Sequence, residues 1–318
     1  MERFKWGLAS LLLVGWPITA VAEAPAGPAA FAGLVTADEP VAYWRFSETE
    51  GNRATSHTRE DARLTGTLVG AAKLGVAGPR RKIYPLFDEA NHALAIQGGK
   101  SFVRVADPGE KSSLDFGNGD AITIEAWVKP DSLGDDQQVY IVGKGRTNNK
   151  GAARDNQNYA LRLRGMGGLA HVSFLFRKAA TAAAPQQFHR WNSRRGFVLD
   201  GTWHHVAIVY EFGKPYAIRA YLDGQESSGS WDMGGPTTDP PVVDNDELWI
   251  GSASGGNPGN TFQGLIDEVA IYRKALDPNR LQERYQAIKP DPREVEFAAA
   301  QAISADRVAV ELYENVGA

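Results

Sequence analysis

Residues 121–129 read Ala-Ile-Thr-Ile-Glu-Ala-Trp-Val-Lys, and apolar residues occupy every second position of this stretch. Its even-numbered residues, from Ile122 to Val128, are all apolar. A β-strand points alternate side chains to opposite faces, so this pattern predicts a strand with one buried face.

Comparable short segments recur along the chain between clusters of Gly, Pro, Asn and Asp, which mark turns. They cover residues 41–46, 102–105, 139–144, 159–164, 172–177, 205–210, 217–222, 248–250 and 265–272. Asp223-Gly224 follows one of them and suits the positive φ angles of a tight hairpin turn. Because no segment in this region keeps a helical period for three turns, we expect an all-β fold with two antiparallel sheets packed face to face.

Three phrases resemble the laminin-G-like jelly-roll modules, and the third is also similar to the end of pentraxin domains. They are residues 122–130 (ITIEAWVKP), residues 200–207 (DGTWHHVA) with 221–224 (YLDG), and residues 264–272 (GLIDEVAIY). The resemblance implies a domain of the concanavalin A-like lectin/glucanase group over residues 40–287. The expected fold is therefore a two-sheet antiparallel jelly-roll β-sandwich.

A short helix is predicted after the last strand, at residues 277–286. Asp277 is a suitable N-cap, Pro278 fits the first helical position, and Leu281 and Tyr285 form an i,i+4 apolar pair. Residues 288–318 are interpreted as a linker and the start of a further segment or truncated domain.

The N-terminus has the features of a signal peptide. Arg3 and Lys5 precede an apolar run over residues 6–16, and small residues at 20–22 fit a cleavage site. The run is shorter than the roughly 20 residues of a membrane span. We expect residues 1–22 to be removed and residues 23–39 to form a flexible leader. The mature chain is then periplasmic, cell-surface or extracellular, without stable membrane insertion. An uncleaved anchor is the alternative, and Pro17 and the cleavage site argue against it.

Composition excludes several functional classes. The chain has 318 residues, and 34 basic residues stand against 38 acidic ones for a net charge of −4, so binding of nucleic acid through bulk charge is not expected. With no Cys, the chain has no disulfide framework, no thiolate zinc site and no cysteine nucleophile.

A catalytic site is not expected either. A glycosidase needs two facing carboxyl groups, which related glucanases carry in an E-x-D-x-x-E phrase that is missing here. Glu125 stands alone among apolar residues, and Asp267 and Glu268 are adjacent, so they point to opposite faces. No G-x-S-x-G phrase is present.

The aromatic and histidine residues of the shared phrases have structural interpretations. We expect Trp127 and Trp203 to fill the core between the sheets. His204 and His205 point to opposite faces and cannot jointly chelate one metal, so His205 is expected to be buried beside a partner on a neighbouring strand or loop.

Calcium is the cofactor that the resemblance implies, as a structural ion at a sheet edge. Asp267 and Asp88 match the acidic positions of the family and are the predicted ligands. The alternative is that each carboxylate accepts hydrogen bonds from the neighbouring backbone. The acidic residues 244–247 are interpreted as a solvated hairpin tip.

Candidate ligand-binding residues are Trp191, Arg194 and Trp231, because sugars stack on exposed aromatic rings with polar groups around them. The basic residues around Trp191 suit an anionic glycan. The alternative is that Trp191 packs onto the sandwich.

Together these features predict an exported, non-catalytic binding or adhesion module whose partner is a glycan or a cell-surface protein. Its binding is either calcium-dependent or independent of calcium. The alternatives are a glycan-active hydrolase and a purely structural spacer, since fold alone does not fix function.

Overall fold

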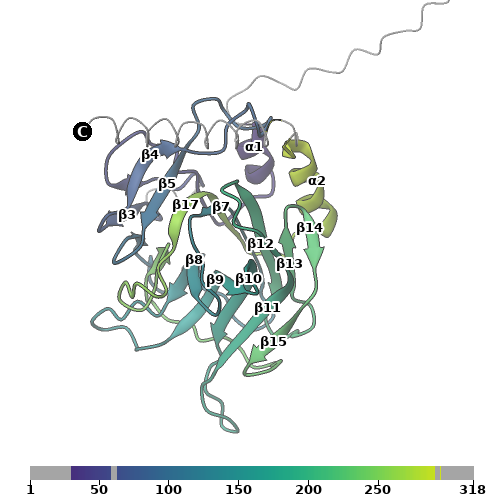
Figure 1. Cartoon of the computed structure of the whole chain (residues 1–318). Helices are drawn as coiled ribbons and strands as arrows, with labels where there is room; N and C mark the ends of the chain where they lie inside the picture. The colour runs from purple at the N-terminus through teal and green to yellow at the C-terminus, as the bar shows by residue number, and fades with distance from the viewer. Residues whose placement is uncertain (1–29, 59–62, 291–293, 295–318) are drawn as a thin grey trace, which may run out of the picture.

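The computed structural model describes residues 30–58, 63–290 and 294, and these form two antiparallel sheets packed as a sandwich (Figure 1). The predicted all-β, two-sheet architecture with a short C-terminal helix is confirmed. The predicted signal peptide and most of residues 288–318 lie outside the described residues.

Sheet A has eight strands, with β1 (Ala42–Trp44) paired to β17 beside the main path. The order along that path is β14 (Gln225–Ser227), β13 (Arg219–Leu222), β12 (His204–Glu211), β7 (Ala121–Pro130), β17 (Gln263–Tyr272), β5 (His92–Gln97) and β4 (Lys73–Ala77).

Sheet B has nine strands, and its longest members lie next to one another. The order is β15 (Gly229–Met233), β11 (Phe188–Phe197), β10 (Leu169–Arg177), β9 (Gln157–Met166), β8 (Gln138–Gly145), β16 (Leu248–Ile250), β6 (Phe102–Val105), β3 (Gly66–Val69) and β2 (Arg53–Ala54).

The core between the sheets is built from the alternating positions that the sequence indicated. The even-numbered residues of β7, from Ile122 to Val128, are fully buried in it. Burial of each large apolar side chain contributes about 1.5–3 kcal/mol, so this face explains why β7 lies at the centre of sheet A.

The other face of sheet A carries a second apolar cluster, and here the prediction for two tryptophans is wrong. Trp127 and Trp203 belong to this outer cluster and not to the core between the sheets. The reason is the strand period: Trp127 is an odd-numbered residue of β7 and points away from Ile122 and Val128.

Helix α1 (Ala30–Thr36) covers part of that outer cluster, which corrects the prediction of a flexible leader for residues 30–36; residues 23–29 lie outside the described residues. Phe31 and Val35 are one helical turn apart and both are buried, and the ring of Phe31 stacks on Phe87 with centroids 4.9 Å apart. The small, Ala-rich composition suggested disorder, but this i,i+4 apolar pair gives the segment a face to bury.

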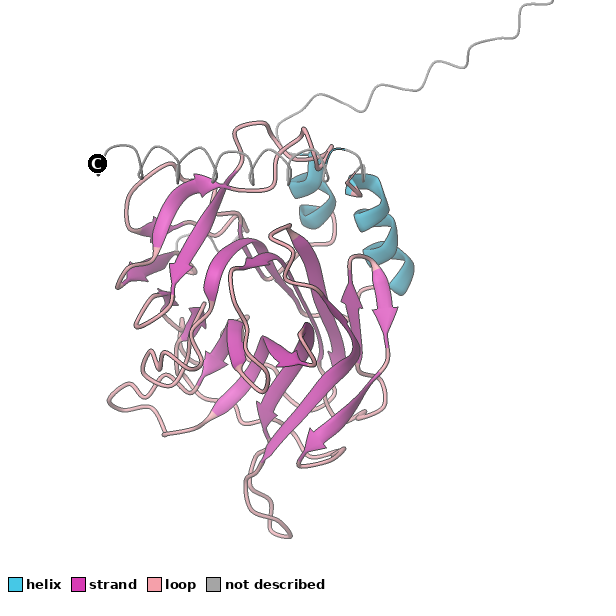
Figure 2. Cartoon of the chain, viewed as in Figure 1, coloured by secondary structure: helices cyan, strands magenta, loops and turns pink. Residues whose placement is uncertain are grey.

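Helix α2 (Pro278–Ile288) lies beside α1 on the same side of the molecule (Figure 2). The predicted cap is confirmed, because the Asp277 side chain accepts a hydrogen bond from the Asn279 amide at 2.8 Å. The hairpin turn is also confirmed: Asp223 and Gly224 have φ angles of 51° and 70°. A Cβ at Gly224 would lie 2.7 Å from the Cβ of Tyr285, so glycine lets α2 approach the turn.

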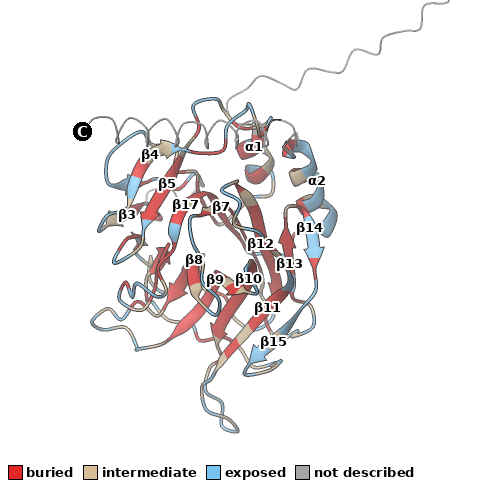
Figure 3. Ribbon diagram, viewed as in Figure 1, coloured by how far each residue is buried: buried red, intermediate tan, exposed pale blue. Residues whose placement is uncertain are grey.

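Exposure differs between parts of the sandwich (Figure 3). Strands β14 and β15, at one end of each sheet, carry mostly exposed residues, whereas β8, β9 and β10 are almost entirely buried. The buried residues of these strands include polar ones on the outer face of sheet B, which makes that face a candidate binding surface.

Candidate binding site on the outer face of sheet B

Strand β9 places arginines on the outer face of sheet B. Its odd-numbered residues from Tyr159 to Leu163 belong to the core between the sheets. Arg162 and Arg164 therefore lie on the opposite, outer face. Sequence reasoning predicted the strand but did not single out Arg162. The signal was the alternation of apolar and basic residues in Leu161-Arg162-Leu163-Arg164.

The register across the sheet surrounds Arg162 with two specific neighbours. Tyr140 on β8 and Ser173 on β10 lie directly opposite it on either side. The Nη2 atom of Arg162 donates a hydrogen bond to the Ser173 Oγ at 3.1 Å, and its guanidinium carbon lies 5.4 Å from the centroid of the Tyr140 ring. These contacts fix the guanidinium in one orientation.

Unlike Arg146 and Arg190, Arg162 has no carboxylate partner among the described residues. Arg190 makes two hydrogen bonds to Asp232, at 2.7 and 2.9 Å, and Arg146 lies 3.3 Å from Asp155. Arg162 is only 2% exposed, and no carboxylate of the described residues lies within 4 Å of it. Its Nε atom is buried without a hydrogen-bond partner among those residues.

The surroundings of Arg162 disfavour its charge. Burial lowers its pKa, the nearby Tyr140 opposes the shift, and the positive charges of Arg190 and Arg146 lower the pKa further, to about 10. Arg162 is therefore still protonated at neutral pH, as a cation in an unfavourable environment.

A hollow of about 300 Å³ lies over this part of the sheet, and its charged lining residues are Arg146, Arg162, Arg190 and Asp136. Apolar surface is added by Leu175 and Phe188. The guanidinium carbons of Arg146 and Arg177 lie 5.0 and 5.4 Å from the centroid of the Phe188 ring.

A second hollow, of about 220 Å³, lies on the same face and contains the predicted residue Arg194 together with Arg164 and Asp232. Asp232 lines this second hollow and pairs both with Arg164 and with Arg190, which lines the first. The role predicted for Arg194 stays a prediction, and its exposed position at a hollow fits it.

The two tryptophans predicted to bind the ligand line neither hollow. Trp191 is 2% exposed and belongs to the core between the sheets, so its ring offers no open surface for stacking. Trp231 is half-buried against the same core, and its indole N–H donates to the Pro215 carbonyl at 3.0 Å. Both were expected in loops but lie opposite each other on paired strands β11 and β15. The geometry gives no support to their predicted ligand role.

The predicted calcium ligands are linked through Asn91. Asp267 is 0% exposed; it accepts hydrogen bonds from Asn91 Nδ2 at 2.7 Å and from the Glu268 amide at 2.9 Å, one on each oxygen. The Asp88 carbonyl accepts from the Asn91 amide at 3.2 Å. Within the described residues, no three His, Asp or Glu side chains gather as a metal site. Both oxygens of Asp267 thus accept hydrogen bonds from protein donors, and calcium at Asp267 and Asp88 stays a prediction.

The acidic loop at residues 244–247 is tied to its neighbours, which the interpretation as a solvated tip missed. Asp246 is 4% exposed and accepts hydrogen bonds from the amide and hydroxyl of Thr147, at 3.1 and 2.5 Å. Asp244 accepts from Asn156 at 2.9 Å. These contacts hold the loop after β8 in place.

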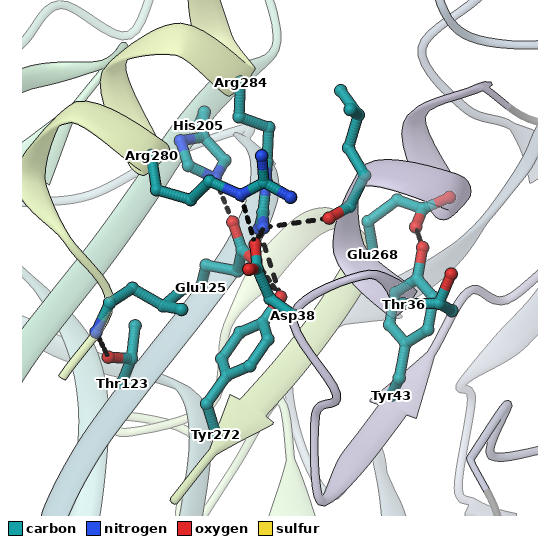
Figure 4. A network of polar contacts seen from close by, with 12 residues as sticks. Thr36, Asp38, Tyr43, Thr123, Glu125, His205, Glu268, Tyr272, Arg280 and Arg284 are labelled. Atoms are coloured by element: carbon teal, nitrogen blue, oxygen red, sulfur yellow. Dashed lines mark hydrogen bonds and ion pairs between the residues drawn. The ribbon is translucent and has the colours of Figure 1, made fainter. Parts of the chain in front are cut away.

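A second group of charged residues lies beneath the helices and is a structural anchor (Figure 4). His205 Nε2 lies 2.9 Å from Glu125 Oε2, which confirms that His205 is buried beside a partner on a neighbouring strand. Glu125 was expected to stand alone, but it also accepts from Tyr272 and pairs with Arg284 of α2. Arg284 in turn pairs with Asp38, next to α1.

The carboxylates on the outer face of sheet B do not have the properties of a hydrolytic pair. Asp136 and Asp232 are both paired with Arg164. Burial raises the pKa of Asp232, but hydrogen bonds and charges from Arg190 and Arg164 outweigh it and leave the pKa below its ordinary value. A general acid in glycoside hydrolysis needs the opposite shift.

Comparisons with known proteins agree with this fold. Among solved structures, the binding domain of Paraclostridial Mosquitocidal Protein 1 has a TM-score of 0.53 and 12% identity, over 78% of this chain and 52% of that one. Domain 4 of AbnA, a GH43 extracellular arabinanase from Geobacillus stearothermophilus in complex with arabinotriose, has a TM-score of 0.48 and 20% identity, over 78% of this chain and 98% of that one. Trypanosoma rangeli sialidase has a TM-score of 0.47 and 14% identity, over 78% of this chain and 32% of the sialidase.

The chain thus spans about half of the toxin domain and about a third of the sialidase, and at 12% identity the likeness to the toxin domain shows the fold alone. Comparison with curated proteins gives no match. The sequence profile of the concanavalin A-like lectin/glucanases superfamily matches residues 97–282. The match covers more than half of the chain and agrees with the laminin-G-like resemblance, and the chain therefore belongs to the concanavalin A-like lectin/glucanase superfamily.

Proposed function

We propose that this chain is a non-catalytic binding module that holds a glycan on the outer face of sheet B. The observation that carries the proposal is the difference between the two outer faces. Helices α1 and α2 cover the outer cluster of sheet A, whereas two polar hollows lie on sheet B.

The chemistry of the first hollow suits a sugar. A sugar ring offers hydroxyl groups at its edge and a patch of C–H groups on its face, so it binds where hydrogen-bonding groups surround an apolar surface. Gln138 and Asn260 offer amide groups at this hollow, and Phe188 offers a half-buried ring.

The superfamily includes both lectins and glucanases, so its name leaves binding and hydrolysis open. The lowered pKa of Asp232 favours binding without cleavage. Display outside the cytoplasm follows from the predicted signal peptide and belongs to the same proposal. In the described part of the chain, no helix has the length and apolarity that a membrane span requires.

A screen of immobilised polysaccharides with wild type, Phe188→Ala and Tyr216→Ala tests the proposal. Phe188→Ala removes the ring at the first hollow and is expected to weaken binding about tenfold, equivalent to about 1.4 kcal/mol. Tyr216 is 84% exposed and does not line either hollow, so Tyr216→Ala is the matched control and is expected to bind as wild type does.

Two outcomes would contradict this function. New reducing ends released from a bound polysaccharide would make the chain a hydrolase. Equal binding by wild type and Phe188→Ala would place the glycan somewhere else on the molecule.

A further inference from the structure

Arg162 has an unusual position for an arginine. It is 2% exposed, yet it donates a hydrogen bond to the neutral hydroxyl of Ser173, and no carboxylate of the described residues pairs with it. Arginine is almost never fully buried unless it is paired, because taking its charge out of water is costly. The free protein therefore holds a cation whose natural complement is not supplied by this part of the chain.

The groups around Arg162 add to this positive field. Arg146 and Arg190 line the same hollow, and burial and these two charges lower the pKa of Arg162. Their carboxylate partners Asp155 and Asp232 do not line this hollow; Asp136 does, and its carboxylate is paired with Arg164 at 2.9 Å. An anion entering the hollow would meet three guanidinium groups, of which Arg190 already donates two hydrogen bonds to Asp232 and Arg146 one to Asp155, whereas Arg162 donates to no carboxylate of the described residues.

We propose that the glycan held on sheet B is acidic, and that its carboxylate or sulfate group docks against Arg162 between Arg146 and Arg190. This inference rests on the proposed function and names the class of ligand. Ser173 and the Tyr140 ring hold the guanidinium in place, so little side-chain freedom is lost on binding. The sugar ring that carries the anion then lies near Phe188.

The proposal has a consequence that a structural role for Arg162 does not share. Replacing Arg162 by methionine removes a buried, unpaired charge and keeps the apolar stem, so Arg162→Met is expected to melt at the same temperature as wild type or higher. The same change is expected to lower the affinity for an acidic glycan at least tenfold. If Arg162 were a structural residue, its loss would instead lower the melting temperature.

The experiment compares wild type, Arg162→Met and Arg104→Met by calorimetric titration and thermal melting. Arg104 lies on β6 of the same sheet, is half-exposed and lines neither hollow, so Arg104→Met removes the same charge away from the site. The probes are oligogalacturonate, oligomannuronate and sialyllactose, each beside its carboxyl-reduced counterpart, and a sulfated chondroitin oligosaccharide.

We expect at least one acidic probe to bind wild type at least tenfold more tightly than its carboxyl-reduced counterpart, with the preference lost in Arg162→Met and kept in Arg104→Met. Preference for the sulfated probe alone supports the same site with sulfate as the anion. Equal binding of the acidic and reduced probes overturns the inference and leaves the proposed function standing. Binding of none of the probes, acidic or neutral, overturns the inference and counts against the proposed function as well.

Discussion

Arg162 and Glu125 are both almost fully buried ionisable residues, and they differ in what surrounds them. Glu125 is 1% exposed and is in contact with His205, Tyr272 and Arg284. Arg162 instead contacts the hydroxyl of Ser173 and the face of the Tyr140 ring. A buried charge with a complete set of partners holds elements together, whereas one without them is available to a ligand. This contrast is the reason for assigning anchoring to Glu125 and binding to Arg162.

The contacts of Glu125 predict a pH-dependent contribution to stability. Burial alone would raise its pKa, but the charge of Arg284, with hydrogen bonds from His205 and Tyr272, lowers the pKa to about 2 from an ordinary value of 4.5. Because the folded-state pKa is lowered, Glu125 stabilises the fold above about pH 4.5, and this stabilisation is lost as the pH falls towards 2.

Glu125→Gln is therefore expected to lower the free energy of unfolding at pH 7 by about 3 kcal/mol, and the difference from wild type should shrink between pH 4.5 and 2. Urea titrations across this pH range measure the difference. Glu226, which pairs with Arg219 at 3.3 Å and is about half exposed, provides the control Glu226→Gln, expected to cost at most 1 kcal/mol at pH 7. A constant difference at all pH values would show that folding does not shift the pKa of Glu125.

At the scale of single elements, the sequence predicts most of the fold because each strand has its own pattern. The period of two in β7 identifies the buried face, and the Asp223-Gly224 turn and the Asp277 cap are set by local chemistry. The same period, applied strictly, also places Trp127 on the outer face. Composition misled only where a short segment, α1, is stabilised by contacts distant in sequence.

The candidate site was less predictable than the strands. Arg162 becomes notable only when the register brings Tyr140 and Ser173 beside it and the described part of the chain pairs no carboxylate with it. Pairing between strands is a long-range property, and a single sequence does not contain it. Trp191 and Trp231 were predicted as ligand-binding residues because their pairing across β11 and β15, which places them against the core, was not foreseen from the sequence.

Helix α1 gives a prediction at the element scale. Phe31 is buried between Phe87 and Trp127, with ring centroids 4.9 and 6.0 Å away, so Phe31→Ala is expected to destabilise the protein by about 3–5 kcal/mol. Phe31→Leu keeps most of the volume and is expected to cost less than about 1.5 kcal/mol. Chemical denaturation of both variants checks this order. An unchanged stability in Phe31→Ala would mean that the segment is a flexible leader after all.

On the scale of the whole molecule, the sandwich has two outer faces with different surroundings. Helices α1 and α2 and the anchor around Glu125 cover part of sheet A, whereas sheet B presents guanidinium, amide and aromatic groups in two hollows. The net charge of −4 makes this concentration of arginines a local feature of one face, and not a property of the chain as a whole.

The most direct measurement is an NMR titration of the ¹⁵N-labelled chain with the acidic oligosaccharide that it binds best. We predict that the largest shift changes occur on β8, β9, β10 and β11, and that the Nε resonance of Arg162 is among them. Shift changes concentrated in the acidic loop at residues 244–247, or on β12 to β14 of sheet A, would contradict the assignment of the outer face of sheet B as the binding surface.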